Sequence, residues 1–227
     1  MPATTSYSSA VLVAEAAALT ESDPVFAQVT LKAYKYGCMI QVSRELIDDT
    51  AIDLEGFLAR EVGIALGVAT GTAQPKGLVT CATLGKTAAA VAAVTMDELI
   101  DLQFSVTPLY RANGAYVMND STAAACRKLK DTTNQYLWQP AVQAGQPDLL
   151  LGKPVWIDPN IAALATGAKT VLFGDISRFF IRDAKGIRFE RSDEYAFGND
   201  LVSFRALMRT DSNLIDNIGA VKYLIQA

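Results

Sequence analysis

The hydrophobic pattern changes phase within the stretch VTLKAYKYGCMIQV, residues 29 to 42. Apolar residues fall on odd numbers at its start and on even numbers from Tyr34 onward. Alternation with a period of two is typical of a β-strand. A change of phase predicts one extra residue in the ladder, a β-bulge, and Gly37 lies close to the change.

A helical repeat follows this strand. Ser43 predicts the N-cap of a short helix, RELIDD, and Thr50 predicts the N-cap of a second helix over residues 51–67. Apolar residues recur at helical spacing in the second helix, at Leu54, Phe57, Leu58, Val62, Ala65 and Leu66. Gly56, Gly63 and Gly67 are poor helix formers, so we expect another backbone to approach this helix closely.

The N-terminal residues predict a long hairpin. Two segments with strand character, residues 9–16 and 25–31, lie on either side of the turn signal TESDP. The hairpin has few large side chains with which to make a core of its own. Because an isolated two-stranded hairpin is marginal in water, it needs support from another surface.

The rest of the chain mixes helices and strands without a regular βαβ repeat. Thr95 and Glu98 predict a capping box that opens a helix over residues 96–106, and Asn119 or Asp120 caps a helix over 121–130. Strands are predicted at residues 115–119, 153–158, 169–175, 178–183, 186–191, 201–209 and 220–225. The fold class is therefore α+β.

Composition removes several kinds of chemistry. The chain of 227 residues contains no histidine, which excludes Ser-His-Asp and Cys-His mechanisms and the usual zinc ligands. Its three cysteines, Cys38, Cys81 and Cys126, lie far apart and predict buried free thiols. Neither a cofactor nor a metal is expected.

Charge and hydropathy limit the partners. The formal net charge of −4 argues against wholesale neutralisation of a phosphate backbone. Charged residues make up 19% of the chain, below the usual ~25%, which favours a surface partly covered by a partner. The longest strictly apolar run, residues 88–94, is too short to span a bilayer, so no membrane contact is expected.

Three carboxylates are the candidates for acid–base catalysis: Asp48, Asp49 and Glu61. Charges at helix starts and on a solvated helix face explain them without catalysis, and we predict no catalytic residue. The loop ATGTAQPKGLVT, residues 69–80, resembles a phosphate loop only superficially, because Lys76 precedes Gly77 instead of following it. A plain turn after a helix is the favoured interpretation.

Two basic groups could bind nucleic acid. The first is Arg178, Arg182, Lys185, Arg188 and Arg191, which alternate with Asp183, Glu190, Asp193 and Glu194. A mixed-charge face or a subunit contact is the favoured interpretation of this cluster. In the second group Tyr34 and Tyr36 lie among Lys32 and Lys35 and could stack on bases, but the period of two favours one face of a strand.

Beyond these features, the sequence resembles a known family. The stretch ESDPVFAQVTLKAYKYGCMIQVSRELIDDTAIDLEGFLAREVGIALG is similar to the major capsid proteins of tailed bacteriophages, with the Hong Kong 97-type fold. The resemblance continues through GTAQPKGL, YVMNDSTAAACRKLKDTTNQYLW, GQPDLLLGKPVWID, LFGDISRFFIRDAKGIRFER and MRTDSNLIDNIGAVKYL. It covers nearly the whole chain in order and spacing.

The resemblance implies a domain organisation. Residues 1–32 correspond to the extended loop, 33–94 to the first part of the peripheral domain with its long spine helix, 95–198 to the axial domain and 199–227 to the return into the peripheral domain. It also implies that an N-terminal arm is missing through truncation or processing.

The implied function is structural. The chain is expected to be no enzyme but the subunit of an icosahedral phage or prophage capsid, assembled in the bacterial host cytoplasm into pentamers and hexamers around double-stranded DNA. Expected partners are other copies, a scaffolding segment, a portal, a maturation protease and non-specifically held DNA. Two alternatives stay open: an encapsulin-like compartment shell, and a carboxylate- or lysine-dependent enzyme.

Overall fold

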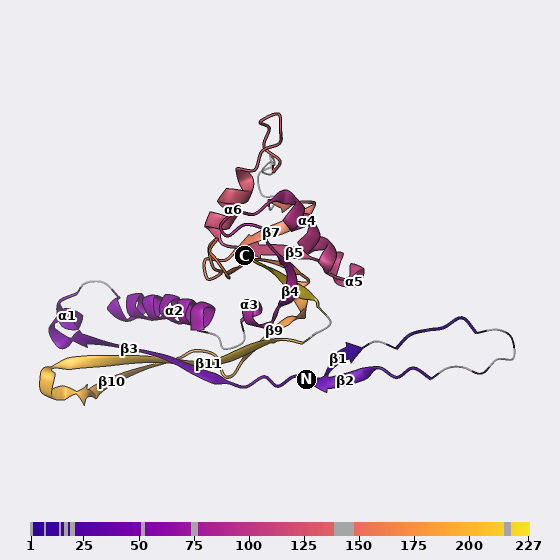
Figure 1. Ribbon diagram of the computed structural model, residues 1–227. Coiled ribbons are helices and arrows are strands. Elements are labelled where there is room, and N and C mark those ends of the chain that lie inside the picture. Colours follow the sequence, from indigo (N-terminus) through magenta and orange to yellow (C-terminus); the bar gives the residue numbers. More distant parts are fainter. Residues whose placement is uncertain are drawn as a thin grey trace. The chain divides into compact units, whose positions relative to one another are not determined.

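The computed structural model describes residues 2–6, 8–13, 15, 18, 21–50, 53–73, 77–138, 148–215 and 219–227. The chain divides into two compact units (Figure 1). We call residues 31–77 and 181–213 the long-sheet unit, and residues 1–30, 78–180 and 214–227 the core-sheet unit.

The long-sheet unit is built on an antiparallel sheet. Its strand order is β10 (Arg188–Ala196), β11 (Leu201–Leu214) and β3 (Tyr34–Ser43), and β9 (Phe179–Asp183) also pairs with β11. The predicted bulge near Gly37 is wrong, because β3 pairs with β11 in unbroken register from Tyr34 to Ser43. The phase changes because the strand begins at Tyr34. Gly37 instead makes room for Leu207, whose Cδ2 would lie 2.8 Å from an added Cβ.

One face of this sheet is covered by helices α1 (Arg44–Asp49) and α2 (Leu54–Ala73), and α2 runs along the strands in Figure 1. Alternate residues of β3 and β11 bury themselves against α2 in two clusters. The cluster members are Val42, Leu58, Val202 and Phe204, then Val62, Leu66 and Ala206. Burying these side chains stabilises the unit by roughly 1.5–3 kcal/mol for each large aliphatic or aromatic group.

The helix boundaries differ from those predicted. Ser43 caps α1 as expected, accepting a hydrogen bond from the Leu46 amide. Thr50 ends α1 and is not the cap of α2; the Asp53 carboxylate accepts from the Gly56 amide instead. The helix then continues to Ala73, where a loop was expected from residue 69. Lys76 lies outside the described residues, so its place in the supposed phosphate loop is not described.

The core-sheet unit contains a mixed six-stranded sheet. Its strand order is β4, β12, β8, β5, β7 and β6. The bounds are Thr83–Thr87, Val221–Ile225, Lys169–Gly174, Ala115–Met118, Lys153–Ile157 and Leu149–Leu150 in that order. All but β4 and β6 were predicted. The sequence TLGKT of β4 shows no clear strand pattern. The strand forms by parallel pairing with β12.

Helices cover both faces of this sheet. On one face lie α4 (Met96–Ser105), α5 (Pro108–Arg111) and α6 (Asp120–Arg127), whose apolar residues meet alternate residues of the strands in the larger core cluster. On the other lie α3 (Leu78–Cys81) and the 3₁₀ turn Ile176–Arg178. Both predicted caps are confirmed: Thr95 and Glu98 form a capping box, and Asn119 accepts from the Ser121 amide.

The N-terminal hairpin pairs β1 (Pro2–Ser6) with β2 (Val25–Gln28). The hairpin itself was predicted, but its first strand was expected at residues 9–16. Among the residues described there, 9–13 and 15 carry no strand. The Ser9 amide donates to the Ser22 hydroxyl at 3.0 Å, which holds the two arms together beyond the strands.

Candidate interaction surface

The face of the long sheet opposite α2 carries many of the unit's charged and polar side chains. We call it the open face. The strand register places on it Lys35, Gly37, Met39, Gln41, Arg188, Glu190, Ser192, Ser203, Arg205, Leu207 and Arg209. Four of these residues are cations and one is an acid, so this face is basic although the whole chain has a net charge of −4.

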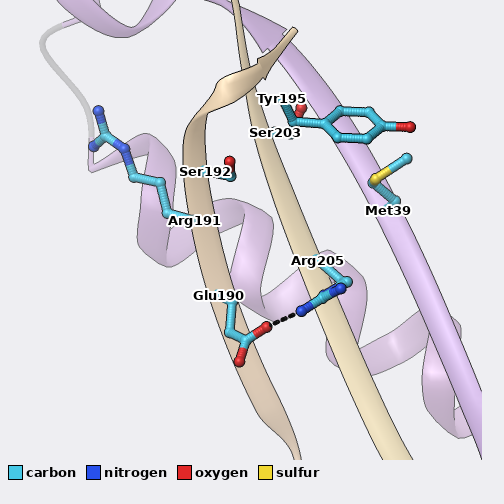
Figure 2. A pocket seen from close by; sticks show the side chains of 7 residues that line it. All are labelled: Met39, Glu190, Arg191, Ser192, Tyr195, Ser203 and Arg205. Atoms are coloured by element: carbon cyan, nitrogen blue, oxygen red, sulfur yellow. Dashed lines mark hydrogen bonds and ion pairs between the residues drawn. The ribbon is translucent and has the colours of Figure 1, made fainter.

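At one end of the open face lies a pocket of about 410 Å³, which we call the tyrosine pocket (Figure 2). Its lining residues are Met39, Glu190, Arg191, Ser192, Tyr195, Ser203 and Arg205. Strand register explains the main contact, since Glu190 and Arg205 are direct partners on β10 and β11 and form an ion pair. Met39 and Tyr195 give the pocket an exposed apolar side.

The electrostatics of this pocket do not suit acid–base catalysis. The hydrogen bond from Arg205 and the charges of Arg205 and Arg188 hold the pKa of the Glu190 carboxyl below its usual value. A general acid or base works best with a pKa near the operating pH, which for a carboxyl requires an upward shift. The lowered pKa keeps Glu190 ionised at neutral pH, as the ion-pair partner of Arg205.

A second hollow, of about 370 Å³, lies on the open face toward the β9–β10 turn. Lys35, Ala184, Lys185, Gly186, Arg188, Leu207 and Arg209 line it, and we call it the cationic hollow. Among these described lining residues four are cations and none is acidic. Such a lining attracts anions.

The three carboxylates considered for catalysis are not gathered into a pocket. Asp48 and Asp49 lie at the end of α1, not at a helix start, and are exposed. Glu61 is exposed on α2. Each therefore belongs to a solvated helix surface.

The basic groups singled out in the sequence are divided by the fold. Arg178 belongs to the core-sheet unit and pairs with Asp175, whereas Arg188 lies on the open face. Arg191 points to the α2 side by register and pairs with Glu55. Arg188 also pairs with Glu190, and Arg191 with Asp193, as the mixed-charge interpretation of this cluster predicts.

The surface on which Tyr34 and Tyr36 could stack on nucleic-acid bases is not formed. Tyr36 packs against the α2 cluster, and Lys35 projects to the opposite face of β3. Tyr36 and Lys35 therefore do not share one surface, as stacking on bases beside a lysine would require.

The comparison with protein families decides the identity. The model of the phage capsid family matches residues 1–224. The chain belongs to the phage capsid family. It is thus a structural subunit of a capsid, not an enzyme.

Solved capsids share this fold over the whole chain. The capsid of a native GTA (gene transfer agent) particle is 27% identical, with a TM-score of 0.87, and the match covers 100% of this chain and 84% of the other. The capsid of an empty GTA particle is 26% identical with the same TM-score and coverage. A structure from Mycobacterium phage Cain, 17% identical at a TM-score of 0.72 over the same shares, supports the fold alone. No curated protein matches the chain.

Sequence reasoning missed two basic residues on the open face of this phage capsid protein. Arg205 and Arg209 were seen as part of a strand, with no role assigned. Their alternation with Phe204, Ala206 and Met208 was a usable signal, because it places the arginines on the face opposite the core.

The described residues also provide no metal site, disulfide or membrane-spanning helix. Within the described residues no group of three His, Cys, Asp or Glu side chains could hold a metal ion. None of the three cysteines, all in described segments, forms a disulfide, and only Cys126 is fully buried. Of the helices described, none is long and apolar enough to cross a membrane.

Proposed function

We propose that this protein assembles into pentamers and hexamers that close into the icosahedral shell of a phage, prophage or GTA particle around double-stranded DNA. The match of the capsid family model to residues 1–224 carries this proposal. The similarity to GTA capsids at 27% and 26% identity over the full length supports it.

The two units suggest a domain assignment for this shell subunit. The long-sheet unit, with the 20-residue helix α2, corresponds to the peripheral domain with its spine helix. The core-sheet unit, without its hairpin, corresponds to the axial domain, and residues 1–30 correspond to the extended loop. This assignment moves the boundaries from residues 33, 95 and 199 to 31, 78, 181 and 214.

Surface features support large contacts between copies. Phe57, Ile64 and Val68 are each more than half exposed along α2. Gly63 and Gly67 have open space where a side chain would point. Apolar and small residues on an exposed helix face allow a second backbone to approach. A scaffolding segment, a portal and a maturation protease complete the proposed set of partners, with assembly in the bacterial host.

Nuclease protection tests whether the particles enclose DNA. Particles purified from cells that express the full-length chain with its packaging genes should keep duplex DNA after nuclease treatment. Intact closed particles that hold only protein, with no protected DNA, would contradict the phage-type function and favour a compartment shell. Particles assembled without packaging genes serve as the empty control.

The proposed shell should bind DNA weakly and without sequence preference, because a packed genome must slide and the chain has a net charge of −4. Fluorescence anisotropy with several unrelated duplexes should give similar, salt-sensitive affinities in the usual non-specific range of about 10⁻⁴–10⁻⁶ M or weaker. Tight binding to one sequence at physiological salt would overturn this part of the proposal.

A further inference from the structure

The cationic hollow holds positive charge that the fold itself does not neutralise. Of its four lining cations, Arg188 forms an ion pair with Glu190 at 3.4 Å. The other three, Lys35, Lys185 and Arg209, are exposed and take part in none of the ion pairs that the described residues form. The hollow therefore keeps positive charge that an anion from outside the chain can match.

Two of these cations repel one another because of strand pairing. Lys35 on β3 and Arg209 on β11 are direct cross-strand partners on the open face. The Cβ atoms of such partners are about 4.5–5.5 Å apart, and like charges at these positions destabilise a sheet. An anion bound between the two side chains would replace this repulsion with two attractions.

The third cation is carried by a strained backbone. Lys185 has a φ of 68°, in the left-handed region that disfavours most residues with a Cβ. The amide of the neighbouring Ala184 donates to the Arg209 carbonyl at 2.8 Å, which fastens this turn beside β11. The chain thus places a lysine where glycine or asparagine would fit with less strain. Departures from local preference of this kind concentrate at functional sites.

We propose that the cationic hollow binds a small oligophosphate anion with two or three linked phosphate groups. Arginine offers phosphate oxygens a planar fork of donors, and lysine offers a compact point charge. A single phosphate group carries about two negative charges near neutral pH, so it would leave one of the three unpaired cations unmatched. Two or three linked groups match all of them. This inference does not depend on the proposed shell function.

The backbone of nucleic acid has the same phosphate chemistry, but the surroundings of the hollow favour the small anion. A surface that binds a nucleic-acid strand follows the backbone with positive charge over several nucleotides. Here the hollow has a volume of about 370 Å³, and on the neighbouring part of the open face Glu190 pairs with both Arg188 and Arg205. The net charge of −4 on the whole chain also opposes a long polyanion.

Isothermal titration calorimetry of the unassembled protein with inorganic triphosphate tests the proposal. The hollow variant, Lys35→Gln with Arg209→Gln, should bind triphosphate at least about tenfold more weakly than the wild type, because two charge-assisted contacts are lost. The matched control is Arg60→Gln with Lys128→Gln, which removes two exposed charges elsewhere and should bind as the wild type does. Every titration is made at one ionic strength, set with sodium chloride, since salt screens such contacts.

Lys185→Asn separates ligand binding from folding. Asparagine tolerates the left-handed backbone better than lysine, so this substitution should raise the free energy of unfolding, measured in urea. It also removes a cation from the hollow and should weaken triphosphate binding several-fold. If Lys185 serves folding alone, the substitution lowers stability and leaves binding unchanged, the opposite result in both measurements.

Three outcomes would overturn the inference. The first is equal affinity of the wild type and the hollow variant for triphosphate. The second is a wild type that binds triphosphate no better than inorganic phosphate. The third is binding of duplex DNA, but not of triphosphate, that is lost in the hollow variant, because the hollow would then be a nucleic-acid contact. Since the titrations use unassembled protein, their results are independent of whether shells form.

Discussion

Cys126 shows how completely one side chain of this capsid protein can be sealed from water. It lies in the larger core cluster of the core-sheet unit, between α6 and the sheet, with no exposed surface. Burial raises the pKa of its thiol to about 11, and burial also raises the pKa of Tyr116 in the same cluster. Both groups stay neutral at physiological pH and act as packing residues.

The titration of Cys126 has a consequence for alkaline stability. Between pH 9 and pH 11 the unfolded chain loses the thiol proton while the folded chain keeps it, so the free energy of unfolding falls as pH rises. The loss should reach about 2 kcal/mol by pH 11. Urea unfolding of subunits kept below their assembly concentration, at pH 8, 9, 10 and 11, measures it. Cys126→Ala should have a shallower decline, and an identical pH slope in variant and wild type would contradict this account.

Residue roles that depend on a few neighbours in the chain were predictable. Thr95, Glu98 and Asn119 cap their helices as the sequence indicates, because the bonding partners are within three residues. Asp53 and Gly37 were misread for opposite reasons. The capping signal at Asp53 was overlooked in favour of Thr50, and the reason for Gly37 is Leu207, a neighbour that only strand pairing supplies.

Helix α2 is the element in which sequence and fold differ most. It continues through Thr70 and Thr72, whose hydroxyls donate to carbonyls one turn earlier, at Gly67 and Val68. The small and polar residues after residue 67 predicted a loop, since their intrinsic helix propensity is weak. Leu58, Val62 and Leu66 pack against the long sheet earlier in the same helix, which the residues after 67 extend.

The glycines of α2 give a prediction at this scale. Gly67→Ala should stabilise the isolated subunit by about 0.5–1 kcal/mol, because alanine favours the helix and no atom lies within 4 Å of the added Cβ. If another copy packs there, the same change should lower the yield of particles. Urea unfolding and sedimentation velocity measure the two effects.

Thr72→Ala is the matched control for Gly67→Ala, because it raises helix propensity without filling space above a glycine. It should leave particle yield unchanged. If Gly67→Ala also assembles at the wild-type yield, α2 does not pack against another copy at this position.

For the whole molecule, the sequence predicts shells without covalent bonds between subunits. Some capsids of this type join a lysine of the extended loop to an asparagine of a neighbour, a reaction that needs an uncharged lysine within reach. Residues 1–31 contain no lysine, and Lys32 is held at its amide by the Asp211 carboxylate at 2.6 Å. Asn199 lies in the turn between β10 and β11.

Purified particles boiled in denaturing detergent should therefore run as single subunits, at 24.3 kDa for this chain. The sample is run with and without reducing agent, since a disulfide would disappear on reduction. A ladder of oligomers that survives reduction would contradict the prediction.

The order of elements in the whole chain could be predicted, but its division into units could not. β4 and β12 lie far apart in sequence, and only their parallel pairing assigns residues 78–94 and 214–227 to one sheet. The open face was equally hidden, because Lys35, Arg188 and Arg209 meet only through the register of three strands.

Cryo-electron microscopy of the purified full-length protein tests the central claim most directly. A phage-type capsid subunit should yield closed icosahedral shells, with five-fold and six-fold capsomers into which the two units of this structure fit as separate bodies. Full-length protein that stays monomeric at high concentration, and forms no shell or capsomer when its scaffolding segment is supplied, would contradict the account.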